Sequence, residues 1–355
     1  MQLAPVLPQS PLKGRIEAAI ARRLLHLPPP FIAWLLGKRR RVINGIALDP
    51  NVQLSLDLFK LTGRPTLDKL SPDVARVEFA KLVPIADLRP RDLHQVQTRM
   101  IPGPGGEMAI RIYRAKPGTL PVLMYVHGGG FVVGNLDTHD PPLRELAHQS
   151  GCAVIAVDYR LAPEHPFPAA LDDALAALRW VQDNAAALGL DAQKIAMGGD
   201  SAGGNLTAAA CHVLQKTGGQ LPVAQLLIYP AVDMHNLAPS RHTYAQGFFL
   251  ERELIAMFVR AYVPAPEMTV DPRISPLLAE DFSGQPPALL LTAGFDPLQD
   301  EGIAYGRKLV AAGSTVEFVH FPAQIHGVFG MAGAVEDGRR AITACAHFLR
   351  STLGA

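Results

Sequence analysis

The sequence has little of what marks a disulfide-stapled, metal-binding or nucleic-acid-binding protein. Its three cysteines, Cys152, Cys211 and Cys345, are too few and too scattered for a disulfide framework or a metal cluster. We therefore expect reduced thiols in a cytoplasmic protein. The 33 basic and 32 acidic side chains leave a net charge of +1. That balance favours neither a nucleic acid nor a strongly anionic partner.

Long apolar runs are also absent. No stretch of 18 or more apolar residues occurs, so the sequence predicts no transmembrane helix and no stable membrane insertion. Residues 1–10 lack the charged start and apolar run of a secretory signal. One apolar block, Phe31 to Leu36, precedes the basic cluster Lys38 to Arg41. It could contact an anionic membrane surface, but we favour a helix whose apolar side packs on the protein itself.

The chain is nevertheless rich enough in apolar residues, at 48%, to bury a sizeable core. Its composition changes near Arg89-Pro90, where helices joined by proline turns give way to short β-rich runs that alternate with helical patterns. Most of these runs are continuously apolar, as expected for strands covered on both faces. The predicted strands are Ala109 to Tyr113, Val122 to Val126, Ala153 to Val157, Ile195 to Met197, Gln225 to Ile228, Ala288 to Thr292 and Val316 to Phe321.

Strands that alternate with helices predict an α/β fold with a mostly parallel central sheet, flanked by helices. Two segments interrupt the alternation: an N-terminal extension over residues 1–79 and a proline-broken insertion over residues 236–276. We expect both to form a helical cap over the C-terminal edge of the sheet, where ligands bind in such folds. The catalytic domain would then comprise residues 80–235 and 277–355.

The first chemical signal is Gly199-Asp200-Ser201-Ala202-Gly203. A predicted strand precedes it and a helical pattern follows, so Ser201 would stand at a sharp strand-to-helix turn flanked by glycines. That position exposes a hydroxyl at a helix N-terminus and makes Ser201 the candidate nucleophile. The alternatives are an ordinary glycine-rich turn or a phosphate loop, although the Lys-Ser/Thr pair of a phosphate loop does not follow.

A second signal, His127-Gly128-Gly129-Gly130, comes directly after the strand Val122 to Val126. Consecutive glycines allow backbone N–H groups to turn toward an oxygen that becomes negative during acyl transfer. The residue after the nucleophile, Ala202, supplies a further amide. A flexible loop is the alternative. A glycine run upstream of the serine motif favours the catalytic interpretation, because both motifs in this order arise by chance much less often than either motif alone.

The acid and the base are expected downstream of the serine. Asp296 follows the strand Ala288 to Thr292, and His326 follows the strand Val316 to Phe321. This gives the chain order serine, acid, histidine. Asp300 or Glu301 is the alternative acid, although both are expected to begin the next helix instead. The weaker histidine candidates lie in the expected cap or inside a strand: His235, His242 and His320.

These motifs together resemble the bacterial hormone-sensitive-lipase-type carboxylesterases, in their Gly-Asp-Ser-Ala-Gly subgroup. The resemblance covers about Leu48 to Leu353 and also rests on Asp158-Tyr159-Arg160-Leu161-Ala162-Pro163-Glu164, Asp296-Pro297-Leu298 and His326-Gly327. It implies an α/β-hydrolase fold, a triad of Ser201, Asp296 and His326, and an oxyanion hole from Gly129, Gly130 and Ala202, flanked by Gly128. It further implies that Arg160 and Glu164 are buried structural partners.

The expected reaction is two-step acyl transfer on a small-molecule ester of short-to-medium acyl length, without a metal or organic cofactor. A peptidase or amidase of the same fold could share the triad, and a non-catalytic ligand-binding protein could share the scaffold. A membrane-peripheral structural protein built around the basic cluster is the remaining alternative. The sequence leaves open whether the chain forms a homodimer.

Overall fold

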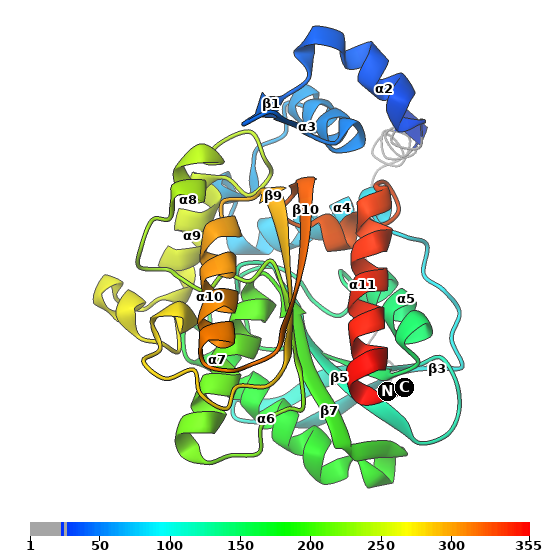
Figure 1. Cartoon of the computed structure of the whole chain (residues 1–355), viewed down its shortest axis with the longest axis vertical. Coiled ribbons are helices and arrows are strands. Elements are labelled where there is room, and N and C mark those ends of the chain that lie inside the picture. The colour runs from blue at the N-terminus through cyan, green and yellow to red at the C-terminus, as the bar shows by residue number, and fades with distance from the viewer. Residues whose placement is uncertain (1–22, 25–26) are drawn as a thin grey trace.

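An eight-stranded sheet forms the centre of the molecule and confirms the predicted α/β class (Figure 1). The computed structural model describes residues 23–24 and 27–355. Across the sheet the strands run in the order β10-β9-β8-β7-β5-β6-β4-β3. Their bounds are β3 (Gln95–Gly103), β4 (Gly106–Arg114), β5 (Leu120–Val126), β6 (Ala153–Val157), β7 (Leu190–Asp200), β8 (Gln225–Ile228), β9 (Ala288–Phe295) and β10 (Val316–Ile325).

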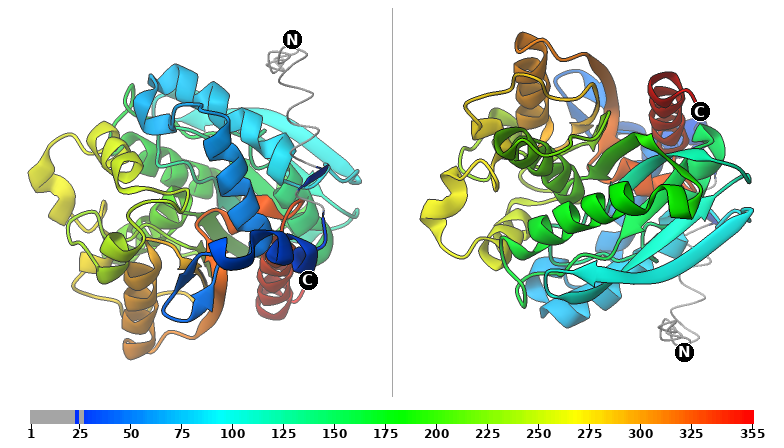
Figure 2. Two further views of the ribbon diagram at one scale, coloured as in Figure 1. Left: turned by 90° about the horizontal axis from the view of Figure 1, so that it is seen from above. Right: turned by 90° about the horizontal axis from the view of Figure 1, so that it is seen from below.

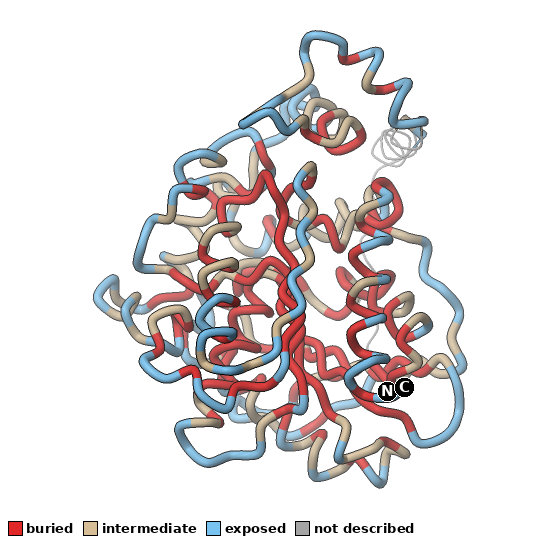
Figure 3. The backbone as a smooth tube through the Cα atoms, in the orientation of Figure 1, coloured by how far each residue is buried: buried red, intermediate tan, exposed pale blue. Residues whose placement is uncertain are grey.

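Each of the seven predicted strands is present, and the sheet is mostly parallel, as expected. The exceptions are the pairs β3–β4 and β4–β6, which are antiparallel. Strand β3 at the edge was not predicted. Every residue of β5, β6, β8 and β9 is buried, so the continuous apolar runs do mark strands covered on both faces (Figure 3).

Helices cover the two faces of the sheet. Met124 of β5 belongs to a core shared with α6 and α7, whereas its neighbour Tyr125 belongs to a core shared with α5 and α11. Alternate side chains of a strand point to opposite faces, so the two helix pairs lie on opposite sides. The helical elements after β5, apart from those within residues 236–276, are α5 (Asp140–Ser150), α6 (Ala169–Asn184), η3 (Ala186–Leu188), α7 (Ala202–Thr217), η5 (Pro276–Leu278), α10 (Gln299–Ala311), η6 (Val328–Met331) and α11 (Glu336–Leu353).

The N-terminal segment lies beyond the ends of β9 and β10, at the top of Figure 1 and on the viewer's side in the left panel of Figure 2. Leu48 and Val52 pack there against Phe295 and Ile325, the last residues of those two strands. Residues 1–22 and 25–26 of the predicted extension lie outside the described residues. The described elements are α2 (Pro29–Leu36), η1 (Gly37–Arg39), β1 (Val42–Ile43), β2 (Ile46–Ala47), α3 (Pro50–Leu61), η2 (Leu67–Lys69) and α4 (Pro72–Ala86).

Local sequence explains why α3 begins where it does. The Asp49 carboxylate accepts hydrogen bonds from the amides of Asn51 and Val52 at 2.8 and 3.1 Å, and Pro50 occupies the first helical position. The Asp49 amide donates to the carbonyl of Ala323 at 2.9 Å. The start of α3 is thus tied directly to β10.

Helix α2 carries apolar side chains on more than one side. Ile32 and Leu36 are buried, which confirms packing on the protein itself. Phe31, Trp34 and Leu35 are exposed, with Trp34 at 74%. No helix in the described ranges combines the length and apolarity needed to cross a membrane.

The insertion over residues 236–276 contains α8 (Pro239–Thr243), α9 (Arg252–Tyr262) and η4 (Pro266–Val270). Tyr262 stacks on Phe131 with ring centroids 3.7 Å apart. Leu254 packs with Leu298 in a small apolar cluster. Helix α9 therefore lies against the loop that follows β5 and the loop that follows β9, at the same edge of the sheet as the N-terminal segment.

One expectation drawn from the family resemblance is wrong. Glu164 is exposed, and its carboxylate pairs with Arg76 at 2.6 Å. Arg160 is only partly buried, and it pairs with the buried Asp173 at 2.8 Å. The buried member of this pair is thus Asp173 in α6, and the partly exposed Arg160 reaches it from the surface. The expectation of reduced thiols is confirmed, since all three cysteines are unpaired and buried.

Candidate active site

Ser201 lies between β7 and α7 in a strained backbone conformation, with φ 55° and ψ −114°. The chain passes very close to β5 at this point. A Cβ atom on Gly199 or Gly203 would lie 2.2 or 1.9 Å from the carbonyl oxygen of Val126. Only glycine fits at both positions, which is the packing expected when a strand turns sharply into a helix and presents the residue between them.

His326 and Asp296 approach this serine from the ends of neighbouring strands. His326 follows β10, and its Nε2 lies 2.9 Å from the Ser201 hydroxyl oxygen. Its Nδ1 lies 2.8 Å from a carboxylate oxygen of Asp296, which follows β9. The other oxygen of Asp296 accepts the Leu298 amide at 2.8 Å. Asp296 is fully buried, and each of its oxygens has a protein partner.

The alternative acids and bases are engaged elsewhere. Asp300 and Glu301 lie in the first turn of α10, as expected. Asp300 accepts the Ser240 amide at 2.8 Å, and Glu301 pairs with Arg241. Among the weaker histidine candidates, His320 lies 2.9 Å from the Thr292 hydroxyl and takes no part in the Ser201 group.

The glycine loop after β5 lies beside the serine, since Gly130 lines the same small cavity as Ser201 and Ala202. Gly129 and Gly130 have φ values of 119° and 60°, which favour glycine. Within the described chain no hydrogen bond engages their amides, nor that of Ala202 at the first position of α7. Helix N-termini carry such unsatisfied donors by construction, and anions bind to them. The structure thus brings together six predicted residues: Ser201, His326, Asp296, Gly129, Gly130 and Ala202.

Asp200 fixes the glycine loop, a role that the sequence analysis missed. One oxygen of its carboxylate accepts the Gly128 amide at 2.9 Å and the Tyr125 hydroxyl at 2.8 Å, and lies 3.2 Å from Nε2 of His139. Burial by itself would raise the pKa of Asp200, but His139 and these donors lower it to about 2. The fixed position of Asp200 beside the serine in the motif was the available signal.

A small cavity opens beside Ser201. Phe258 of α9 closes one side of it, because a Cβ atom on Gly130 would lie only 2.2 Å from the Phe258 ring. Arg241 is the one charged residue in its lining, and the sequence analysis did not single it out. The lining residues are Gly130, Phe131, Ser201, Ala202, Ala231, Met234, Arg241, Leu250, Ile255, Phe258, Val259 and Leu298.

Comparison with known proteins agrees with this geometry. The sequence model described as the alpha/beta hydrolase fold matches residues 123–330. The carboxylic ester hydrolase LipN of Mycobacterium tuberculosis is 38% identical over 330 residues, which cover 90% of this chain and 87% of that protein. The chain belongs to the hormone-sensitive-lipase-type carboxylesterases of the α/β-hydrolase fold. The carboxylesterase NlhH of the same organism is 40% identical over 80% of this chain and 90% of that one.

Solved structures of this family superpose closely on the chain. An ester hydrolase from the metagenome of Lake Arreo, in complex with a bipyridine phosphonate derivative, gives a TM-score of 0.85 at 43% identity, over 87% of this chain and 100% of that one. A hyperthermophilic esterase from the archaeon Pyrobaculum calidifontis gives 0.82 at 38% identity, over 87% and 99%.

Proposed function

We propose that this carboxylesterase hydrolyses small-molecule esters of short-to-medium acyl length, with Ser201 as nucleophile, His326 as base and Asp296 as the acid that orients the base. The observation that carries the proposal is the hydrogen-bonded series Ser201, His326, Asp296, with distances of 2.9 and 2.8 Å. Both lie within the reach that proton transfer requires.

In the first step His326 Nε2 takes the hydroxyl proton as the Ser201 oxygen attacks the ester carbonyl carbon. The carbonyl oxygen becomes negative, and the free amides of Gly129, Gly130 and Ala202 are the donors that would stabilise it. The imidazolium then gives its proton to the leaving alcohol, and the acyl group remains on Ser201.

In the second step water replaces the alcohol. The same imidazole takes a proton from the water as its oxygen attacks the acyl carbon, and returns that proton to the Ser201 oxygen as the acid leaves. Asp296 keeps the imidazole in the tautomer that accepts at Nε2. Because its carboxylate also accepts the Leu298 amide, its orientation is set independently of the histidine.

We further propose that the segments over residues 1–79 and 236–276 act as a cap that limits acyl length. The support is apolar packing at the edge of the sheet that carries Ser201. Phe258 lies against Gly130, and Leu250 and Ile255 also line the cavity. Such a lid excludes water from developing charge and restricts the depth available to the acyl chain.

A panel of p-nitrophenyl esters of increasing acyl length tests the proposal. We expect kcat/KM to be highest for short and medium chains and to be low for emulsified long-chain triglycerides. A p-nitroanilide of the favoured acyl group separates ester hydrolysis from amidase activity. Faster turnover of the anilide than of the ester would replace the proposed function by an amidase.

The Ser201→Ala variant is the matching test of the nucleophile. Turnover should fall by several orders of magnitude, with only the residual catalysis of oxyanion donors and binding left. Covalent labelling by an organophosphonate should vanish with it. Ser351→Ala, at the exposed end of α11, serves as the control and should label normally. Labelling of Ser201→Ala at another serine would refute the assignment.

We also propose a cytoplasmic location. Its support is that all three cysteines are buried and unpaired, as in proteins of reducing compartments. Fractionation of cells that express the full chain tests it, and recovery of the activity in the secreted or periplasmic fraction would contradict it.

A further inference from the structure

The cavity beside Ser201 contains a feature that the proposed reaction does not use. Its lining is apolar apart from Ser201 itself and the side chain of Arg241. Arg241 lies in α8 and is only 9% exposed. A buried guanidinium is costly unless each of its donors finds an acceptor, so the fate of its nitrogens is informative.

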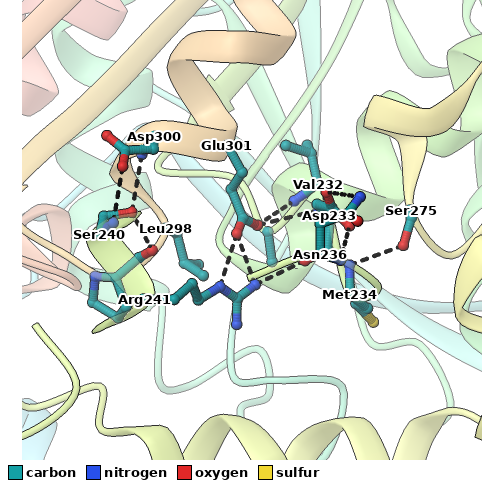
Figure 4. Close-up of polar contacts among 12 residues, drawn as sticks. Val232, Asp233, Met234, Asn236, Ser240, Arg241, Ser275, Leu298, Asp300 and Glu301 are labelled. Atoms are coloured by element: carbon teal, nitrogen blue, oxygen red, sulfur yellow. Dashed lines mark hydrogen bonds and ion pairs between the residues drawn. The ribbon is translucent and has the colours of Figure 1, made fainter. Parts of the chain in front are cut away.

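Two of the three nitrogens are satisfied by protein atoms, as Figure 4 shows. Nε donates to a carboxylate oxygen of Glu301 at 2.9 Å, and Nη2 lies 2.8 Å from the same oxygen. Nη2 also donates to the carbonyl of Asp233 at 2.9 Å. Glu301, itself 2% exposed, accepts the amides of Val232 and Asp233 with its other oxygen. The guanidinium is therefore held in one orientation.

The third nitrogen, Nη1, has no hydrogen-bond partner among the described residues. Nη1 is also not among the fully buried side-chain nitrogens without a partner, so part of its surface remains accessible. In Figure 4 it points away from both Glu301 and Asp233. Because Arg241 lines the cavity next to Ser201, the unpaired Nη1 is the donor of its side chain that remains for a molecule bound there.

The charge of the acceptor follows from the surroundings. Arg241 and Glu301 already form a balanced pair in a buried site. A carboxylate on the substrate would add an uncompensated negative charge next to Glu301, at high cost in a low dielectric. A neutral ether, hydroxyl or carbonyl oxygen would satisfy Nη1 without adding charge.

We infer that Arg241 is a specificity-determining residue whose Nη1 donates to a neutral oxygen of the substrate, so that the enzyme favours oxygen-bearing esters over their alkyl counterparts. Glu301 acts as the positioning residue that orients this donor. The inference rests on the proposed function and narrows its substrate class.

Two pairs of isosteric esters test the inference. On the alcohol side 2-methoxyethyl acetate is compared with butyl acetate, and on the acyl side methyl 3-methoxypropanoate is compared with methyl pentanoate. The measured quantity is the ratio of kcat/KM for the ether to that for the alkyl ester. Comparing this ratio between enzymes cancels the intrinsic difference in reactivity within each pair.

The variant Arg241→Lys keeps a positive charge opposite Glu301 but loses the second arm of the fork. Because this variant loses a hydrogen bond from a charged donor, we expect the ratio for one of the two pairs to fall about tenfold or more relative to the wild type. Arg252→Lys, an exposed position at the start of α9, is the matched control and should leave both ratios unchanged.

The outcomes are distinct. If alkyl esters are hydrolysed and neither ratio responds to Arg241→Lys, the inference fails while the proposed function stands. If no ester is hydrolysed by the wild type, the proposed function fails first. If monomethyl succinate is preferred to both ethers, the acceptor is anionic and the neutral-oxygen claim is overturned. Should Arg241→Lys fail to label with a small phosphonate, the double variant Arg241→Gln/Glu301→Gln provides the same comparison with a neutral pair.

Discussion

The Asp200→Asn variant tests how the glycine loop after β5 is held in place. The substitution keeps the shape of the side chain but removes the negative charge that three donors share. These donors are the Gly128 amide, the Tyr125 hydroxyl and His139, at 2.9, 2.8 and 3.2 Å. Because Gly128 precedes Gly129 and Gly130, the two proposed oxyanion donors of this loop, the loop should lose both stability and precision.

The magnitude follows from the pKa of the carboxyl group. Burial opposes ionisation of Asp200, yet His139 and the donors lower its pKa from 3.8 to about 2. A depressed pKa means that the charged form stabilises the fold above pH 4, and that this contribution is lost as the pH falls through 2. A shift of nearly two units corresponds to about 2 kcal/mol at pH 7. At pH 3 the same relation leaves about 1 kcal/mol.

Urea denaturation at pH 7 and at pH 3, followed by circular dichroism, measures both values. The free energy of unfolding of Asp200→Asn should be about 2 kcal/mol below that of the wild type at pH 7 and about 1 kcal/mol below it at pH 3. Asp183→Asn, on the exposed side of α6, is the control and should change little at either pH. An equal loss at both pH values would refute the reasoning, since the charge would then contribute nothing.

Three further outcomes are expected. Asp296→Asn should lower turnover on the order of 10⁴-fold by leaving the imidazole in the wrong tautomer, and Asp300→Asn should cost far less. Gly130→Ala should nearly abolish turnover, because its Cβ would meet the Phe258 ring at 2.2 Å; an unchanged kcat would exclude this loop from the reaction. Deleting residues 1–47 should raise KM or shift the acyl preference while phosphonate labelling persists, and an unchanged chain-length profile would separate this segment from the cap.

The sequence predicted the buried part of the fold best. Strands β6 and β8 run over the predicted residues, because β6 is a continuous apolar run and β8 is one after its first residue, Gln225. Strand β3 was missed because it lies at the edge of the sheet, where Gln95, Gln97 and Thr98 interrupt any apolar pattern. Its pairing with β4 follows from tertiary context that local patterning does not carry.

The sequence analysis named neither helix α5 nor helix α11, for different reasons. Helix α5 begins at Asp140-Pro141-Pro142, and consecutive prolines suggest a turn although they also fit a first helical turn, where no amide partner is needed. Helix α11 did carry a signal. Its buried residues Ala341, Ile342, Cys345, Ala346 and Leu349 recur at helical spacing, and they could have been identified.

The candidate site likewise contains residues that the sequence predicted and residues that it did not. Ser201, Asp296 and His326 each come within five residues of the end of a predicted strand and directly after the observed one, so topology brought them to one edge of the sheet. Arg241 and Glu301 are 60 residues apart and meet only because α8 folds back onto the start of α10. From sequence Glu301 is adequately explained as a negative residue in a first helical turn, and nothing local distinguishes it from Asp300.

Asp300 and Glu301 lie in different environments, although they are neighbours in sequence. Asp300 faces the Ser240 amide, whereas Glu301 turns inward to two backbone amides and a guanidinium. Burial raises the pKa of Glu301, whereas the contacts with Arg241 and the two amides favour its charged form. A buried ion pair is weak evidence for stability, because well-packed apolar residues often serve as well. Arg241 lies in the wall of the cavity beside Ser201, and its Nη1 has no partner among the described residues. The pair is therefore better explained by what it presents to a ligand than by what it adds to the fold.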